Sequence, residues 1–368
     1  MALVSDAKKL ATLLLLALTA LVGCAPKVTA QKPRFFWPPP PAEARIEFVD
    51  YFQSTKDVDR ESGSWLEDFF LGEEEPEPIF NNPMDIASDG RRVMVTDGGF
   101  HRVMVIDRVT RQLRQLKSAS GENFLFSAPY GVTIDPQGNA YVTDTSSSKL
   151  FVFGPDETLQ KVIGDEELTR PTGVAVDPSR GRIYVVDTAE HQVVGFDLRG
   201  KKLFAWGERG LGEGKFNFPT DIDVDAEGNL YVLDSLNAKV QVLDQNGVFL
   251  RAFGERGSAL GSFQVPKGLS VSPTGLVVVT DSLAKRFVIF NTKGDYLLSV
   301  GGRQLFDGTV SPGGFYLPMG IDIDQNSTIW IVDALNRIAN QYQYLTGEYL
   351  AAHPISPKDT YVPQPDNK

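Results

Sequence analysis

The chain has 368 residues, of which 42% are hydrophobic, and it carries a net charge of −11 with one cysteine and three histidines. This composition allows a sizeable core, and the negative charge argues against a nucleic-acid partner because phosphates would be repelled. One cysteine cannot form an internal disulfide, so a disulfide-stabilised scaffold is excluded.

The N-terminus has the pattern of an export signal. Lys8 and Lys9 precede an uncharged apolar run, Leu10–Val22, of 13 residues. A membrane-spanning helix needs about 20 apolar residues, so this run is too short for a permanent anchor and fits a cleaved signal. We therefore predict a signal peptide over residues 1–23.

The signal ends in Leu21-Val22-Gly23-Cys24, which resembles the bacterial lipobox. The resemblance implies that Cys24 is diacylated and becomes the first residue of the mature chain, which is enough lipid for stable anchoring. An ordinary signal with a chance cysteine is the alternative. We expect an exported protein that is lipid-anchored through Cys24, and Ala25 favours the outer membrane if the host is Gram-negative.

Residues 24–44 contain the predicted lipidated cysteine followed by a tether. Pro38–Pro41 favour a stiff polyproline II segment. The aromatic run Phe35–Trp37 could enter the membrane interface or pack on the folded domain, and we favour packing. Arg45–Val49 is predicted as a strand, and Ser64–Gly72 as a short helix with a serine cap and a glycine stop.

From residue 80 the sequence contains six repeats, marked by prolines 42 to 52 residues apart. A large apolar residue precedes each proline by three positions, and an aspartate follows it by 14 to 16. The prolines are Pro83, Pro129, Pro171, Pro219, Pro266 and Pro318; the aspartates are Asp97, Asp144, Asp187, Asp234, Asp281 and Asp333. Each unit is predicted to form four short strands joined by glycine-containing turns, which is typical of a propeller blade.

The repeated motifs resemble the NHL repeat over about residues 80–353. In one unit they are Phe253–Gly257, Gly261–Phe263, Pro266–Gly268, Thr280–Asp281 and Arg286–Phe290. The resemblance implies an all-β, six-bladed β-propeller with four antiparallel strands per blade, over residues 45–355, before a flexible tail at 356–368. We expect Arg45–Val49 to pair with an outer blade edge and close the ring, and Gly347 to form the turn before a fourth strand.

The six repeat aspartates are interpreted as architectural. Each ends a second strand, where a carboxylate can accept backbone N–H bonds, and an active site is needed once rather than six times. His101 and His191 follow Asp97 and Asp187 by four residues, so we interpret them as loop residues too. A two-histidine metal site is the alternative.

Four acidic residues follow the prolines on the predicted innermost strands, where glycine or alanine is usual: Asp85, Asp221, Asp223 and Asp322. Carboxylates that converge on a central channel suit a hard cation such as Ca²⁺. They could instead bind water or backbone amides. These four residues are the candidate metal site, with Ca²⁺ as the possible ion; no catalytic residue is assigned, because no serine elbow or phosphate-binding loop is present.

The leading function is a binding or scaffold propeller at the cell envelope, with a protein or glycan as partner and no nucleic acid. Gly301–Leu317 and Lys117–Ala128 are the candidate contact loops, since they are longer than strand geometry requires. The runner-up is a metal-dependent propeller enzyme. Relatives with six blades include calcium-dependent lactonases and esterases, and also metal-dependent amidating lyases. An enzyme of this kind would use the channel carboxylates as metal ligands.

Overall fold

The computed structural model describes residues 34–58, 77–164, 166–302, 312–356 and 359–361. Residues Met1–Pro33 and Arg34–Lys368 separate into two units, and all described residues belong to the second. The predicted signal peptide, Cys24 and the predicted helix Ser64–Gly72 lie outside the described residues. Within the described ranges, no helix is long and apolar enough to span a membrane.

Short apolar segments between turns form four-stranded sheets, as the repeats predict. Blade 1 contains β3 (Pro83–Ser88), β4 (Arg92–Asp97), β5 (Arg102–Asp107) and β6 (Gln112–Gln115). Blade 2 contains β7 (Pro129–Ile134), β8 (Ala140–Asp144), β9 (Lys149–Phe153) and β10 (Leu159–Ile163). Blade 3 contains β11 (Pro171–Asp177), β12 (Arg182–Asp187), β13 (Gln192–Asp197) and β14 (Lys202–Trp206).

Blades 4 and 5 repeat the pattern, and blade 6 differs at its outer edge. Blade 4 contains β15 (Pro219–Val224), β16 (Leu230–Asp234), the short helix η2 (Ser235–Asn237), β17 (Lys239–Leu243) and β18 (Phe249–Phe253). Blade 5 contains β19 (Pro266–Val271), β20 (Leu276–Asp281), β21 (Arg286–Asn291) and β22 (Tyr296–Gly301). Blade 6 begins with β23 (Pro318–Ile323), β24 (Thr328–Asp333) and β25 (Ile338–Tyr344).

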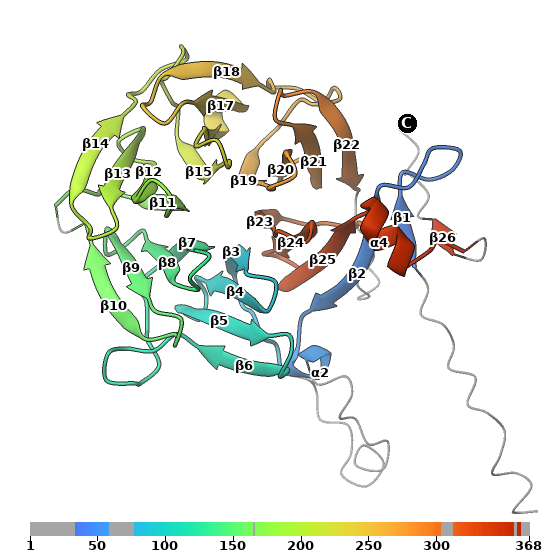
Figure 1. Ribbon diagram of the computed structural model, residues 1–368, viewed down its shortest axis with the longest axis horizontal. Coiled ribbons are helices and arrows are strands. Elements are labelled where there is room, and N and C mark those ends of the chain that lie inside the picture. The colour runs from blue at the N-terminus through green and yellow to red at the C-terminus, as the bar shows by residue number, and fades with distance from the viewer. Residues whose placement is uncertain (1–33, 59–76, 165, 303–311, 357–358, 362–368) are drawn as a thin grey trace, which may run out of the picture. The chain divides into compact units, whose positions relative to one another are not determined.

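The six first strands contact one another in sequence order around a ring, and β23 contacts β3 (Figure 1). Each is the edge strand of its sheet, and in blades 1 to 5 the other three strands follow outward in chain order. The fold is therefore a six-bladed β-propeller, as predicted. This arrangement stacks the apolar faces of adjacent blades, which a single sheet could not bury alone.

An N-terminal strand completes blade 6. Strand β2 (Ile46–Phe52) pairs antiparallel with β25, which confirms the predicted closing strand. The predicted turn and fourth strand at Gly347 are wrong. Because β2 already occupies the outer edge of β25, Gly347 instead begins helix α4 (Gly347–Ala352), capped by Thr346, whose hydroxyl accepts the Tyr349 N–H at 3.2 Å.

Part of the predicted tether is built into the same sheet. Strand β1 (Phe35–Trp37) pairs with β2 and, in parallel, with β26 (Thr360–Tyr361), while helix α2 (Thr55–Val58) follows β2. Phe36 is fully buried and Trp37 is 4% exposed. This burial confirms packing of the aromatic run on the folded domain rather than exposure to a membrane.

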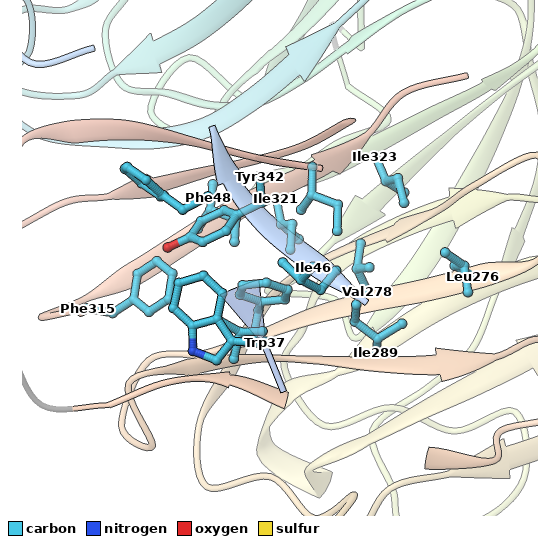
Figure 2. Close-up of a cluster of buried hydrophobic side chains, with 14 residues drawn as sticks. Trp37, Ile46, Phe48, Leu276, Val278, Ile289, Phe315, Ile321, Ile323 and Tyr342 are labelled. Carbon is cyan, nitrogen blue, oxygen red and sulfur yellow. The ribbon is translucent and has the colours of Figure 1, made fainter. Parts of the chain in front are cut away.

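The apolar core is divided among the blade interfaces. Between blades 5 and 6 (Figure 2), Ile46 and Phe48 of β2 pack with Val278 and Ile289 of blade 5 and with Tyr342 of blade 6. Burial of one such large apolar side chain contributes about 1.5–3 kcal/mol. The N-terminal strand therefore contributes to the core as well as to the hydrogen-bonded edge.

Candidate functional site

The repeat aspartates hold the loops that lead into each blade. Asp97 accepts the backbone N–H groups of Asn81 and Asn82 at 2.8 and 3.0 Å, immediately before Pro83. Asp144, Asp187, Asp281 and Asp333 accept pairs of N–H groups in the same way, and Asp234 accepts one together with the side chains of Asn237 and Gln241. All six are fully buried, which confirms their architectural role.

The two candidate histidines occupy a loop position that has a positive φ in every blade. The six residues are His101, Ser148, His191, Ala238, Lys285 and Arg337, with φ between 52° and 57°. His101 Nδ1 lies 2.8 Å from the Ser127 carbonyl, and His191 Nδ1 accepts the Phe218 N–H at 3.0 Å. Both histidines therefore connect their loop to the next blade, as the loop interpretation expects.

The four candidate channel carboxylates lie on the innermost strands and reach the neighbouring blade. Asp85 of β3 accepts the Val132 N–H of β7 at 2.9 Å, and Asp221 of β15 accepts the Leu269 N–H of β19 at 2.7 Å. Asp223 and Asp322 repeat the contact, to Val271 of β19 and to Ser88 of β3, each at 2.7 Å. Each carboxylate thus fastens one blade to the next.

Hydroxyl groups form a second set of inter-blade links, which the sequence reasoning missed. Thr96 donates to the Tyr130 carbonyl at 2.6 Å and Thr188 to the Pro219 carbonyl at 2.7 Å. Thr143, Ser235 and Ser282 link the remaining pairs from blade 2 to blade 6. The sequence feature that could have predicted these links is a Ser or Thr next to the repeat aspartate in blades 1 to 5.

The seam between blades 6 and 1 has a different arrangement. Val332 and Ala334 flank Asp333, so no hydroxyl is available at the positions that link the other blades. Here the Asp322 carboxylate supplies the polar contact to Ser88. Asp322 also lies 3.3 Å from the Ser270 hydroxyl, which in turn lies 3.1 Å from Asp223.

The channel raises the pKa of all four carboxyl groups. Desolvation is the main cause in each case, opposed by backbone hydrogen bonds. Repulsion between channel aspartates adds to the rise for Asp85, Asp221 and Asp322, and repulsion from Asp225 adds to it for Asp223. The pKa of Asp85 rises to about 7, that of Asp223 to about 6 and that of Asp322 to about 8. The pKa of Asp221 is well above its usual range. Burial in the channel therefore favours the neutral form of these carboxyl groups.

The hydrogen bonds of the four channel carboxylates fit a structural role between adjacent blades better than a metal centre. A calcium site needs six to eight oxygen ligands, whereas these carboxylates accept backbone N–H groups. Among the residues that the structure describes, no group of three or more His, Cys, Asp or Glu side chains is placed to hold a metal ion. The assignment of Asp85, Asp221, Asp223 and Asp322 to a metal site stays a prediction.

The channel is narrow beside Asp85 and Asp221. A cavity of about 10 Å³ lies against them, bounded also by Tyr130, Lys267 and Met319. This volume has room for about one water molecule. Desolvation, together with the nearby positive charge of Arg170, lowers the pKa of Lys267. This part of the channel therefore offers no space for an organic substrate.

A larger cavity opens on what we call the turn face, the side formed by the turns between first and second strands. Its volume is about 510 Å³, and turns of blades 2 to 5 line it. Val176, Val224 and Val271, the ends of inner strands, contribute apolar side chains, together with Pro178 and Pro273. A concave surface with apolar lining and a few polar groups is typical of a binding site.

The two predicted contact loops have different outcomes. In Lys117–Ala128, Phe126 is 5% exposed and packs against Phe124 with ring centroids 4.7 Å apart, so part of this loop is core, while Leu125 is 72% exposed. Residues 303–311 of Gly301–Leu317 lie outside the described ranges, and Phe315 is fully buried. Contact of either loop with a partner stays a prediction.

Known proteins share the repeat and the fold with this chain. The NHL repeat family matches residues 168–196, which span β11 to β13 of blade 3. A relative, rat peptidylglycine alpha-amidating monooxygenase, is 31% identical over 135 residues. That match covers 33% of this chain but only 13% of the rat protein.

Two solved structures resemble the fold. A Bacteroides thetaiotaomicron protein of unknown function has a TM-score of 0.56 at 18% identity, covering 72% of this chain and 70% of that chain. A streptogramin B lyase has a TM-score of 0.53 at 12% identity, covering 72% and 94%. At these identities the likeness concerns the fold alone. The described part of this chain is thus a six-bladed β-propeller that contains an NHL repeat.

Proposed function

We propose that the chain is a binding or scaffold propeller, exported and held at the cell envelope by lipid on Cys24, with a protein partner on the turn face. One observation carries the proposal: the channel carboxylates bond to backbone amides of adjacent blades, while the 510 Å³ cavity on the turn face remains open. The valine and proline side chains that line this concavity can receive apolar side chains of a protein partner.

A metal-dependent enzyme is the second candidate. It is favoured by the matched part of the rat amidating monooxygenase, a relative that is an enzyme. In this chain such an activity would need the inner aspartates as ligands, and their oxygens already serve as acceptors between blades. The binding function requires no change in these hydrogen bonds, so we prefer it.

Site-specific photo-crosslinking in the native cell envelope tests the binding function. A photoreactive amino acid at Ala226, which is exposed and lines the cavity, should give a discrete cross-linked product. The same group at Leu297, 43% exposed on the outer edge strand of blade 5, is the matched control and should give none. Equal products from both positions, or none from Ala226, would contradict the proposal.

The lipid anchor is tested separately. Cys24→Ala removes the thiol that would carry the diacylglycerol, so the protein should move from the membrane fraction to the soluble fraction, and its incorporation of a labelled fatty acid should disappear. The neighbouring variant Ala25→Ser should remain in the membrane fraction. A membrane-bound, unlabelled wild-type chain would show that the anchor is something else.

A further inference from the structure

A groove on the turn face runs outward between blades 4 and 5. Besides the 510 Å³ cavity, a second cavity of about 390 Å³ lies on the same face. Both are lined by Asp225, Ala226, Ser272 and Pro273, so they are continuous. The first includes residues of the innermost strands, and the second includes Arg251 of the outermost strand β18, so the groove extends from the channel toward the rim.

Side chains fill the equivalent space between blades 1 and 2. There Arg92 donates to the Gly138 carbonyl at 2.9 Å, and Arg114 donates to both oxygens of Glu157 at 2.9 and 2.8 Å. In blade 4, Asn229 stands five residues before the repeat aspartate, as Arg92 does in blade 1. Arginine is therefore replaced by a shorter side chain at this position of the groove.

The carboxylate of Glu157 is also missing between blades 4 and 5. Gly294 occupies the equivalent position in the turn of blade 5, and both residues have a positive φ, 67° for Glu157 and 93° for Gly294. Since glycine has no side chain, position 294 provides no carboxylate equivalent to that of Glu157. The arginine itself is retained: Arg251 pairs with Val242 as Arg114 pairs with Val105.

Arg251 consequently has unused hydrogen-bonding capacity. Its guanidinium donates to the Tyr231 hydroxyl at 3.0 Å and to the Thr292 carbonyl, and its Nε is buried with no partner. Within the described ranges, no carboxylate forms an ion pair with it. A guanidinium matches a carboxylate in a two-pronged geometry, which Arg114 and Glu157 already display.

We propose that this groove binds an extended peptide segment that carries apolar side chains and one carboxylate. The apolar side chains occupy the inner cavity beside Val176, Val224 and Val271. The carboxylate forms an ion pair with the guanidinium of Arg251, through the terminal nitrogen that does not donate to Tyr231 and Thr292. Asp225 and Glu227 line the outer cavity and would repel a polyanion, and the positive charge of Arg251 offsets this repulsion for one carboxylate only. This inference rests on the proposed binding function and names the partner chemistry.

Fluorescence anisotropy with the full chain in detergent tests it. The probes are two labelled octapeptide pools, rich in Leu and Val, that differ only in one Glu or Gln. We expect the Glu pool to bind about tenfold more tightly, as a charge-assisted hydrogen bond implies. Arg251→Gln should remove this preference, and Ala226→Trp, which fills the groove, should abolish binding of both pools.

Arg114→Gln is the matched control. It breaks the ion pair with Glu157 and should lower the unfolding midpoint without changing peptide affinity. Four results would overturn the inference. The two pools could bind with equal affinity, or neither could bind at all. The Glu preference could survive Arg251→Gln, or peptide binding could survive Ala226→Trp. If the pools fail while Ala226 still cross-links to a partner, the binding function stands and only the peptide assignment is lost.

Discussion

Asp322 lies at the seam that lacks a hydroxyl link, and burial raises the pKa of its carboxyl group. Its carboxyl pKa is about 8 in the folded chain against 3.8 in the unfolded chain. A raised pKa stabilises the folded state fully below about pH 4, and this contribution is lost as the pH rises through about 8. The other channel aspartates shift in the same direction.

Asp322→Asn tests this titration. The amide oxygen can still accept the Ser88 N–H but carries no charge, so the unfolding free energy of the variant relative to that of the wild type should rise by about 4 kcal/mol between pH 5 and pH 9. Urea denaturation at both pH values measures it, with exposed Asp156→Asn as control; identical pH profiles for wild type and Asp322→Asn would refute the account.

At the level of single residues, the sequence predicts the repeat aspartates but not the partners of the channel aspartates. An identical residue in six registered repeats points to a shared backbone contact. Asp85 and Asp221 interrupt a glycine position in two blades only, and their acceptor role depends on how the next strand packs against them. The distance between each carboxylate and the backbone N–H of the next blade cannot be inferred from the spacing of residues within one repeat.

The element that closes the ring is β2, whose pattern was visible in the sequence. Its alternation of apolar residues predicted a strand, and an unpaired blade edge predicted a partner. The helix that begins at Gly347 could not be predicted from the sequence, because glycine is compatible with both a turn and the start of a helix. The decision comes from β2, which lies some 300 residues earlier in the chain and occupies the edge that a fourth strand would need.

Ile46→Ala tests the contribution of β2. Ile46 is fully buried between blades 5 and 6, so truncation should lower the unfolding free energy by about 3 kcal/mol. Leu297→Ala, on the partly exposed outer strand of blade 5, should cost less than about 1 kcal/mol. Chemical denaturation compares the two. Equal losses would show that the N-terminal strand does not hold the ring closed.

For the whole molecule, six repeats were sufficient to predict a closed ring, since each blade needs neighbours on both faces. The turn-face groove was not predictable. It lies between blades 4 and 5, where Asn229 and Gly294 stand at the positions that Arg92 and Glu157 occupy between blades 1 and 2. The groove depends on side chains from two adjacent blades. Aligning the repeats compares equivalent positions but does not show which side chains from neighbouring blades meet.

The role of the channel carboxylates separates a binding propeller from a metal-dependent enzyme. Elemental analysis of the purified chain, combined with calorimetric titration of Ca²⁺ and Zn²⁺, measures that role directly. We predict less than stoichiometric metal, no saturable heat of binding and no change in melting temperature with chelator. One tightly bound ion per chain, lost in Asp221→Asn, would contradict the central claim that these carboxylates fasten blades together.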